Sequence, residues 1–324
     1  MSGIRGYVPY KPRADAQHWL DCVWQVLVEN KDELPLMMRE VFYRLVEDHR
    51  LPKTDANFDR VCNIVARARR AHLVSGEGIP FEAIYDGGQS SSQDPTIYDD
   101  ADDFNRQVEK AARRFRLNRQ AGQEQVIELW CEATGWMPLL KEFGVEFSAK
   151  VTTGSGYDST TLRHDLATRT VERAERERVS TVVLHVGDFD PSGENMVAVL
   201  SEDVGEMLGQ RTEEEPGSWF EVVRVALTEQ QIIDLGVETA PPKPKDSRMV
   251  QFIRGHRRLV EHLGSTDISA QLEALKRPQL RALLREAIES RFDMAGYREV
   301  LAQEAEVRGE LMDKLGIDET EDDQ

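Results

Sequence analysis

The sequence predicts an α/β protein: a small helical domain, then a mostly parallel sheet, then a helical C-terminal extension. Three observations support this fold class. Apolar residues recur at helical spacing through the first 75 residues, short valine-rich runs alternate with helical segments from residue 125 onward, and the pattern is helical again beyond residue 250. Alternation of buried strands with amphipathic helices is typical of a parallel sheet covered on both faces.

The composition indicates a globular protein with more than one domain. A chain of 324 residues exceeds the roughly 250 to 300 residues at which single cores stop growing. No run approaches the roughly 18 apolar residues of a membrane span, and the N-terminus carries no apolar export segment. We therefore expect a cytoplasmic protein without a membrane partner. Cys22, Cys62 and Cys131 are widely spaced, which disfavours a disulfide framework or a zinc site.

The net charge of −18 is unevenly distributed along the chain. Most of it lies in three acidic segments, residues 94–103, 201–215 and 318–323. Local stretches are basic, among them residues 39–70 and 106–119. Because distribution matters more than the sum, the acidic total does not exclude a nucleic-acid partner.

The first 90 residues read as a winged-helix domain. Apolar residues predict helices at about 14–30, 36–48 and 55–74, and Asp55 suits the start of the third helix. Residues 79–85 have strand character and are expected to form the wing. Three helices and a wing fit a domain of this length.

The third helix carries a polar stripe at helical spacing. Its members are Arg60, Asn63, Arg67 and Arg70. Such a stripe can lie along a nucleic-acid groove. The alternative is an ordinary solvated helix face, which is the commoner origin of a charged stripe.

The rest of the chain divides into three parts. Residues 91–123 are expected to be a linker and a basic helix at about 99–120, residues 124–235 a sheet domain, and residues 236–324 a helical extension with an acidic tail. Strands are predicted at 125–131, 145–152, from Val182 to the aspartates that follow, and at 219–227. Helices are predicted between them, one ending near Gly144 and two at about 159–178 and 194–208.

Asp188 and Asp190 follow a buried, valine-rich strand directly. Residues i and i+2 of an extended segment point the same way, so both carboxylates can face one hard cation, and Mg²⁺ is the default choice. Glu132 closes an earlier strand, so three carboxylates can converge at one sheet edge. The alternative is structural, because turns and helix starts use aspartate readily.

Tyr43 lies beside Phe42 on the second predicted helix. The ordinary role of such a residue is a half-buried ring with a solvated hydroxyl. Tyrosine can also attack phosphorus as a nucleophile, and Arg39 and Arg44 are near enough in sequence to hold a phosphate.

Four motifs occur in order along the chain: Met38-Arg39-Glu40-Val41-Phe42-Tyr43, Leu129-Trp130-Cys131-Glu132-Ala133-Thr134-Gly135, Thr153-Gly154-Ser155-Gly156-Tyr157 and Asp188-Phe189-Asp190-Pro191-Ser192-Gly193. Together they resemble the A subunit of type IIB topoisomerases and its meiotic double-strand-break relative. In the third motif Ser155 stands where the family has lysine.

The resemblance implies a winged-helix domain followed by a Toprim metal-binding domain, which is Rossmann-like. It implies that Tyr43 is the nucleophile with Arg39 beside it, and that the Mg²⁺ ligands are Glu132, Asp188 and Asp190. It also implies a homodimer in which the tyrosine of one subunit meets the Toprim site of the other. An ATPase B-type subunit in trans is a further implied partner, although the chain most resembles compact, stand-alone members of the family.

The leading functional hypothesis is therefore a nucleoid-associated, topoisomerase-like protein that cleaves DNA by Mg²⁺-dependent transesterification. DNA contacts are expected from Arg44 and from the polar stripe of the third helix. Two alternatives stay open at this point. One is a Toprim nuclease that uses metal-activated water, and the other is a non-catalytic DNA-binding protein.

Overall fold

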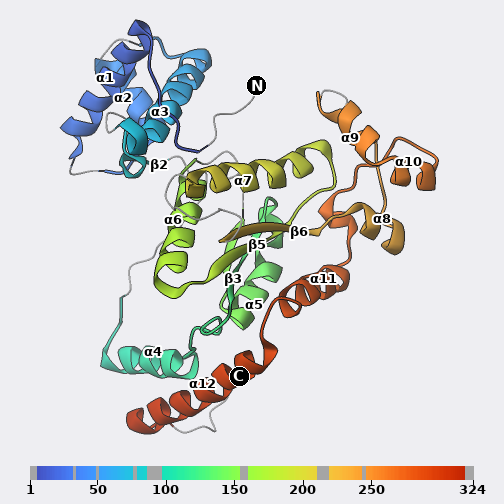
Figure 1. The fold of residues 1–324 in the computed structure, drawn as a ribbon. Coiled ribbons are helices and arrows are strands. Elements are labelled where there is room, and N and C mark those ends of the chain that lie inside the picture. The colour runs from blue at the N-terminus through green and yellow to red at the C-terminus, as the bar shows by residue number, and fades with distance from the viewer. Residues whose placement is uncertain are drawn as a thin grey trace.

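The computed structural model describes residues 6–31, 34–48, 51–75, 79–85, 97–153, 160–209, 219–242 and 246–317. Within them, a helical N-terminal domain precedes an all-parallel sheet flanked by helices, which confirms the α/β class (Figure 1). The helices are α1 Ala14–Glu29, α2 Met38–Asp48, α3 Asp55–Ser75, α4 Ala101–Arg113, α5 Met137–Phe147, α6 Thr160–Glu177, α7 Pro191–Gly209, α8 Glu229–Leu235, α9 Met249–Gly255, α10 Arg257–Leu263, α11 Arg277–Glu289 and α12 Met294–Leu315. The strands are β1 Leu36–Met37, β2 Ile84–Tyr85, β3 Gln125–Cys131, β4 Lys150–Thr153, β5 Ser180–Val186 and β6 Phe220–Ala226.

The N-terminal domain has its own core between α1, α2 and α3. Val23, Val41, Leu45 and Val65, which are almost fully buried, lie at the centre of this core. The three predicted helices are confirmed, because the apolar faces that the spacing identified are the faces that pack together.

The predicted wing strand at 79–85 is largely wrong. Residues Phe81–Ala83 form a single 3-10 turn, and only β2 is a strand, paired in parallel with β1. Phe81 is buried against the sheet domain, where its ring stacks on His164 at 4.3 Å between centroids. This packing turns the segment inward. Residues 76–78 and 86–96 lie outside the described part of the chain.

The sheet has the strand order β4-β3-β5-β6, and all its strand pairs are parallel. From β3 the chain goes to β4 on one side, then returns past β3 to β5 on the other, so the strand order reverses between β3 and β5. The core around α5 covers one face of the sheet, and the core around α6 and α7 covers the other. Ligands of open parallel sheets bind at the carboxyl ends of the strands where the order reverses.

Two boundaries in the sheet domain differ from the predictions. α5 continues to Phe147 instead of ending near Gly144, so the predicted strand from residue 145 shrinks to β4. Phe143 and Phe147 are four residues apart, lie on one helix face and are both buried, which favours the extra turn. Ser148 then ends the helix in a left-handed conformation with φ 52°.

Two further helices also differ in length. α4 ends at Arg113 instead of near residue 120, because Arg119 turns back to pair with buried Glu304 of α12 at 2.7 Å. α7 begins at Pro191 instead of residue 194. Proline suits the first position of a helix, since its missing N–H has no helical partner there.

The C-terminal helices share a core with the sheet. Leu259, Leu272, Leu280 and Leu284 are fully buried in the same cluster as the residues of α5. An antiparallel bridge also joins Phe189, between the two aspartates, to Ala270. The predicted helical extension is therefore present, but it packs as part of the sheet domain.

A buried ion cluster joins the N-terminal domain to the sheet domain. Asp203 of α7 is fully buried. Its carboxylate accepts hydrogen bonds from the guanidinium of Arg70 of α3 at 2.6 Å, from the guanidinium of Arg163 of α6 at 2.8 Å and from the N–H of Gly6 at 2.7 Å. Burial opposes ionisation, yet these hydrogen bonds keep the pKa of Asp203 below its usual value. The N-terminal helices accordingly lie beside α6 and α7 in Figure 1.

Candidate functional site

The predicted metal ligands lie where β3 and β5 end, at the point where the strand order reverses. Cys131, the last residue of β3, pairs with Val186, the last residue of β5. Glu132 follows the first of these strands at once, and Asp188 and Asp190 follow the second within four residues. The tertiary structure therefore brings all three carboxylate-bearing segments to one sheet edge.

Asp188 is held by two other parts of the chain. Its Oδ1 accepts a hydrogen bond from the N–H of Leu272 at 2.9 Å, and its main-chain oxygen accepts one from the guanidinium of Arg224. The side chain is half-buried. The backbone that follows β5 is thus fixed from both sides before α7 begins.

Asp190 is the N-cap of α7. It is 9% exposed, and its Oδ1 accepts the N–H of Gly193 at 2.7 Å. The glycine is required here, because a Cβ on residue 193 would overlap the main-chain oxygen of Asp188. The motif from Asp188 to Gly193, which we call the acidic turn, is therefore tightly packed.

Negative charge gathers around the end of β3. Burial raises the pKa of the Cys131 thiol to about 12, and the carboxylates of Glu273, Asp188 and Glu132 act in the same direction. Glu132 and Glu273 are both exposed. The sequence does not predict that Glu273 lies near the end of β3, because this residue is far along the chain and belongs to no motif.

The donor set at this edge fits a hard cation. Carboxylate oxygens are the preferred ligands of Mg²⁺, which is bound through one or two carboxylates together with waters and substrate phosphates. Among the residues that the structure describes, no group of three or more His, Cys, Asp or Glu side chains is arranged to hold an ion. The edge therefore brings carboxylate-bearing segments together without a preassembled set of three ligands in the described residues.

Arg224 of β6 is the second residue that sequence reasoning missed. It is mostly buried and donates to the carbonyls of Leu227 at 2.6 Å and Gly193 at 2.9 Å, besides Asp188. Burial lowers its pKa, while the carboxylates of Glu194, Asp190 and Asp188 oppose this change. A lone arginine inside the apolar run of β6 was the signal in the sequence, and its role is to hold the acidic turn.

His256 fastens the C-terminal helices to the start of α7. Its Nε2 is 2.8 Å from Glu194 and its Nδ1 is 2.7 Å from Glu229, while its ring packs edge-on against Phe189 at 4.6 Å. Burial opposes protonation, but the hydrogen bonds that the imidazole donates to the carboxylates of Glu194 and Glu229 raise the pKa of His256 above its ordinary value.

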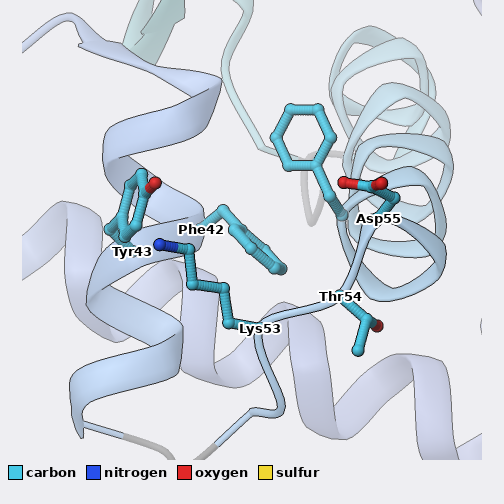
Figure 2. Close-up of a pocket in the computed structure, with 6 residues that line it drawn as sticks. Phe42, Tyr43, Lys53, Thr54 and Asp55 are labelled. Atoms are coloured by element: carbon cyan, nitrogen blue, oxygen red, sulfur yellow. The ribbon is translucent and has the colours of Figure 1, made fainter.

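Tyr43 is on α2 with 43% of its surface exposed. It borders a surface hollow of about 430 Å³, which we call the Tyr43 hollow. The hollow is lined by Phe42, Tyr43, Lys53, Thr54, Asp55 and Phe58. Figure 2 shows Lys53 reaching toward Tyr43, whereas Asp55 projects from the opposite side.

The predicted DNA-binding residues are not all at the surface. Arg44, Arg60, Asn63 and Arg67 are exposed, and Arg60 pairs with Asp15 at 2.6 Å. Arg70 does not lie on the exposed face with them, because its side chain is 4% exposed and pairs with Asp203 in the buried ion cluster. The side chain of Arg39 and residues 154–159 lie outside the described part of the structure.

Tyr43 and the acidic turn belong to different parts of the chain. The N-terminal domain meets α7 at Asp203, twelve residues beyond Pro191, which corresponds to roughly 18 Å along the helix axis. The ion cluster that anchors the tyrosine domain is thus well separated from the start of α7, where Asp190 lies.

Comparison with known proteins gives no family assignment: no family model matches the chain, and no curated protein matches it. None of the helices in the described residues is long and apolar enough to cross a membrane.

Proposed function

We propose that this protein cleaves DNA by Mg²⁺-dependent transesterification, with Tyr43 as the nucleophile. The observation that supports the proposal is that the segments bearing Glu132, Asp188 and Asp190 follow the carboxyl ends of two adjacent parallel strands where the strand order reverses. Such a crevice is where open α/β sheets bind ligands. An exposed tyrosine on a separate helical domain supplies a group that can attack phosphorus.

In the proposed reaction the Tyr43 oxygen forms a bond to a backbone phosphorus and loses its proton. The bond from that phosphorus to the departing sugar oxygen breaks, and the sugar oxygen takes up a proton, leaving a phosphotyrosyl link. Glu132, Asp188 and Asp190 would hold Mg²⁺, which would supply positive charge against the charge developing on the phosphoryl oxygens. Arg44 and the exposed part of the α3 stripe contact backbone phosphates and position the strand.

The proposed active site draws on two copies of the chain. Within one chain the tyrosine domain is anchored near the far end of α7 from Asp190. A second protomer can present its Tyr43 to the acidic turn of the first, which makes the active unit a homodimer. In this proposal the N-terminal domain acts as a winged helix and the sheet domain as a Toprim domain.

Trapping the covalent intermediate tests the proposal. Wild-type protein incubated with supercoiled DNA and Mg²⁺, then denatured with detergent, is expected to carry covalently attached DNA. Tyr43→Phe and Asp188→Ala are expected to form no adduct. EDTA added before the DNA is expected to prevent adduct formation by the wild type. Absence of any Tyr43-dependent adduct under these conditions contradicts transesterification.

A hydrolytic nuclease is the second candidate, and the separation of Tyr43 from the acidic turn favours it, since metal-activated water needs no second chain. The two candidates differ in one variant. Tyr43→Phe retains cleavage if water is the nucleophile and loses it if tyrosine is. Asp188→Ala loses cleavage in both cases.

A further inference from the structure

The Tyr43 hollow combines aromatic walls with one cation and one anion. Phe42 and Phe58 pack edge-to-face at 5.2 Å and are among the residues that line it. The Nζ of Lys53 lies 4.7 Å from the centre of the Tyr43 ring. Asp55, at the start of α3, is on the other side (Figure 2). The positive charge is therefore on the tyrosine side of the hollow.

The position of Lys53 is determined by the backbone on both sides of it. The N–H of buried Leu51 donates to Leu45 at 3.2 Å. After Lys53, the side chain of Asn57 donates to the carbonyl of Pro52 at 2.7 Å, and its N–H donates to the Thr54 hydroxyl at 3.2 Å. The Lys53 backbone is thus anchored to the core and to the first turn of α3.

The cation–π contact with the Tyr43 ring is too weak to explain why the Lys53 ammonium lies at this position. An exposed cation–π contact contributes only about 0.5 to 1 kcal/mol. Within the described part of the chain no carboxylate pairs with the Lys53 ammonium, although Asp55 lines the same hollow. An ammonium held beside a solvent-exposed tyrosine is suited to a small anion that approaches the tyrosine.

We propose that Lys53 and the Tyr43 hollow form a binding site for a backbone phosphate of DNA. The Lys53 ammonium contacts a non-bridging oxygen of the phosphate that faces the Tyr43 hydroxyl, and it offsets negative charge there as a compact point charge. Asp55 repels the same phosphate and so confines it to the tyrosine side. This inference rests on the proposed function of Tyr43, and it adds Lys53 as a catalytic residue.

Four variants test the site, with adduct formation and oligonucleotide binding as the two measurements. Lys53→Met is expected to slow adduct formation by roughly 100-fold. It is also expected to reduce the salt dependence of binding a short single-stranded oligonucleotide by about one phosphate contact. Lys53→Arg keeps the charge and restores most of the binding. Asp55→Asn is expected to bind more tightly than wild type. Lys141→Met, on exposed α5 surface, removes the same charge elsewhere and leaves both measurements unchanged.

The outcomes separate this inference from the function on which it rests. If the wild type forms the adduct and Lys53→Met forms it at the same rate with the same salt dependence, the phosphate site is wrong and the role of Tyr43 stands. If the wild type forms no adduct, transesterification is wrong, and the binding measurement alone decides the site. An unchanged salt dependence in Lys53→Met then overturns it, and a reduced one retains it. Thermal unfolding of each variant confirms that it is folded.

Discussion

The acidic turn and the Tyr43 hollow are built in opposite ways. Asp190 is 9% exposed, caps a helix and is packed so closely that residue 193 has no room for a side chain. Tyr43 is 43% exposed on a helix surface, and its ring contacts are with Phe42 and Lys53. The Asp190 carboxylate therefore contributes to the stability of the fold, whereas the Tyr43 hydroxyl contributes little to it.

This difference has a consequence for mutagenesis. Substitutions that disturb the packing of the acidic turn are expected to change stability and activity together, so a lost activity there does not by itself identify a ligand. Substitutions of the exposed side chains of the Tyr43 hollow, Tyr43 and Lys53, are expected to change activity with little change in stability.

The largest effect is expected at the buried ion cluster that joins the N-terminal domain to the sheet domain. Asp203→Ala leaves the buried guanidinium groups of Arg70 and Arg163 without their carboxylate, which costs about 4 kcal/mol. Urea unfolding measures the loss. Asp234→Ala, at an exposed aspartate of α8, is the control and is expected to change stability by less than about 0.5 kcal/mol. Equal stability of the two variants contradicts a structural role for the ion cluster.

Gly193→Ala is expected to destabilise the protein by about 2 kcal/mol, because its Cβ overlaps the main chain of Asp188. Mg²⁺-dependent cleavage should fall with it, since the acidic turn must move. Gly205→Ala, on the same helix α7, has open space around the added carbon. That control is expected to stabilise by about 0.5 to 1 kcal/mol in thermal unfolding. A neutral Gly193→Ala would show that the turn is loosely held.

Two variants at Asp190 separate capping from metal binding. Asp190→Ala removes the N-cap of α7 and is expected to cost about 1 kcal/mol. Asp190→Asn can still cap the helix and should keep nearly wild-type stability, yet it loses the carboxylate. If Mg²⁺ binds the folded wild type, it is expected to raise the Tm. Both variants are expected to lose this rise and to lose cleavage. Retention of both properties in Asp190→Asn would remove this residue from the metal site.

A smaller effect follows from His256, whose pKa is raised above its ordinary 6.5 despite burial, through Glu194 and Glu229. The folded state then binds the proton more tightly than the unfolded chain. The added stability, on the order of 1 kcal/mol, is fully present below about pH 6.5 and is lost as the pH rises through the folded-state pKa. Urea unfolding between pH 5.5 and pH 9 measures it. His256→Gln should lack this component, and identical pH profiles would refute the assignment.

The smallest effect on stability is expected for Tyr43→Phe, within about 0.5 kcal/mol of wild type. The hydroxyl is on an exposed side chain, so its removal leaves no buried group unsatisfied. Covalent attachment to DNA is nevertheless expected to disappear. A large loss of stability in this variant would mean that Tyr43 belongs to the packed part of the molecule, and the contrast between the two regions would fail.

Much of the fold was accessible from the sequence, because local pattern and tertiary packing agree. The helices α1, α2, α3 and α6 and the strands β3 and β6 lie close to their predicted positions. The errors fall where long-range packing overrides the local pattern. The buried Phe147 extends α5 into the segment predicted as a strand. Arg119 was predicted to lie in α4, but it pairs with Glu304 beyond the end of that helix. Phe81 was predicted to lie in the wing strand, but it packs on His164 of the sheet domain.

The candidate site was only partly accessible. The motif spacing identified Glu132, Asp188 and Asp190, and the register of β3 with β5 places them at one edge. Arg224 and Glu273 come from distant segments, so no local spacing could connect them to the acidic turn. Arg70 had the spacing of a surface stripe and is buried, because periodicity identifies a helix face without saying what covers it.

The sequence by itself determined the α/β class, the order of the main elements and the place of the carboxylate motif at the end of a buried strand, since these depend on periodicity and on residues close together in the chain. Only the tertiary structure decided which strands are neighbours, that the Arg224 guanidinium binds the acidic turn, and that the Lys53 ammonium lies beside the Tyr43 ring. The first two are contacts between segments far apart in the chain, and the third joins α2 to the segment that precedes α3. All three are settled by burial, charge compensation and the fit of side chains in three dimensions.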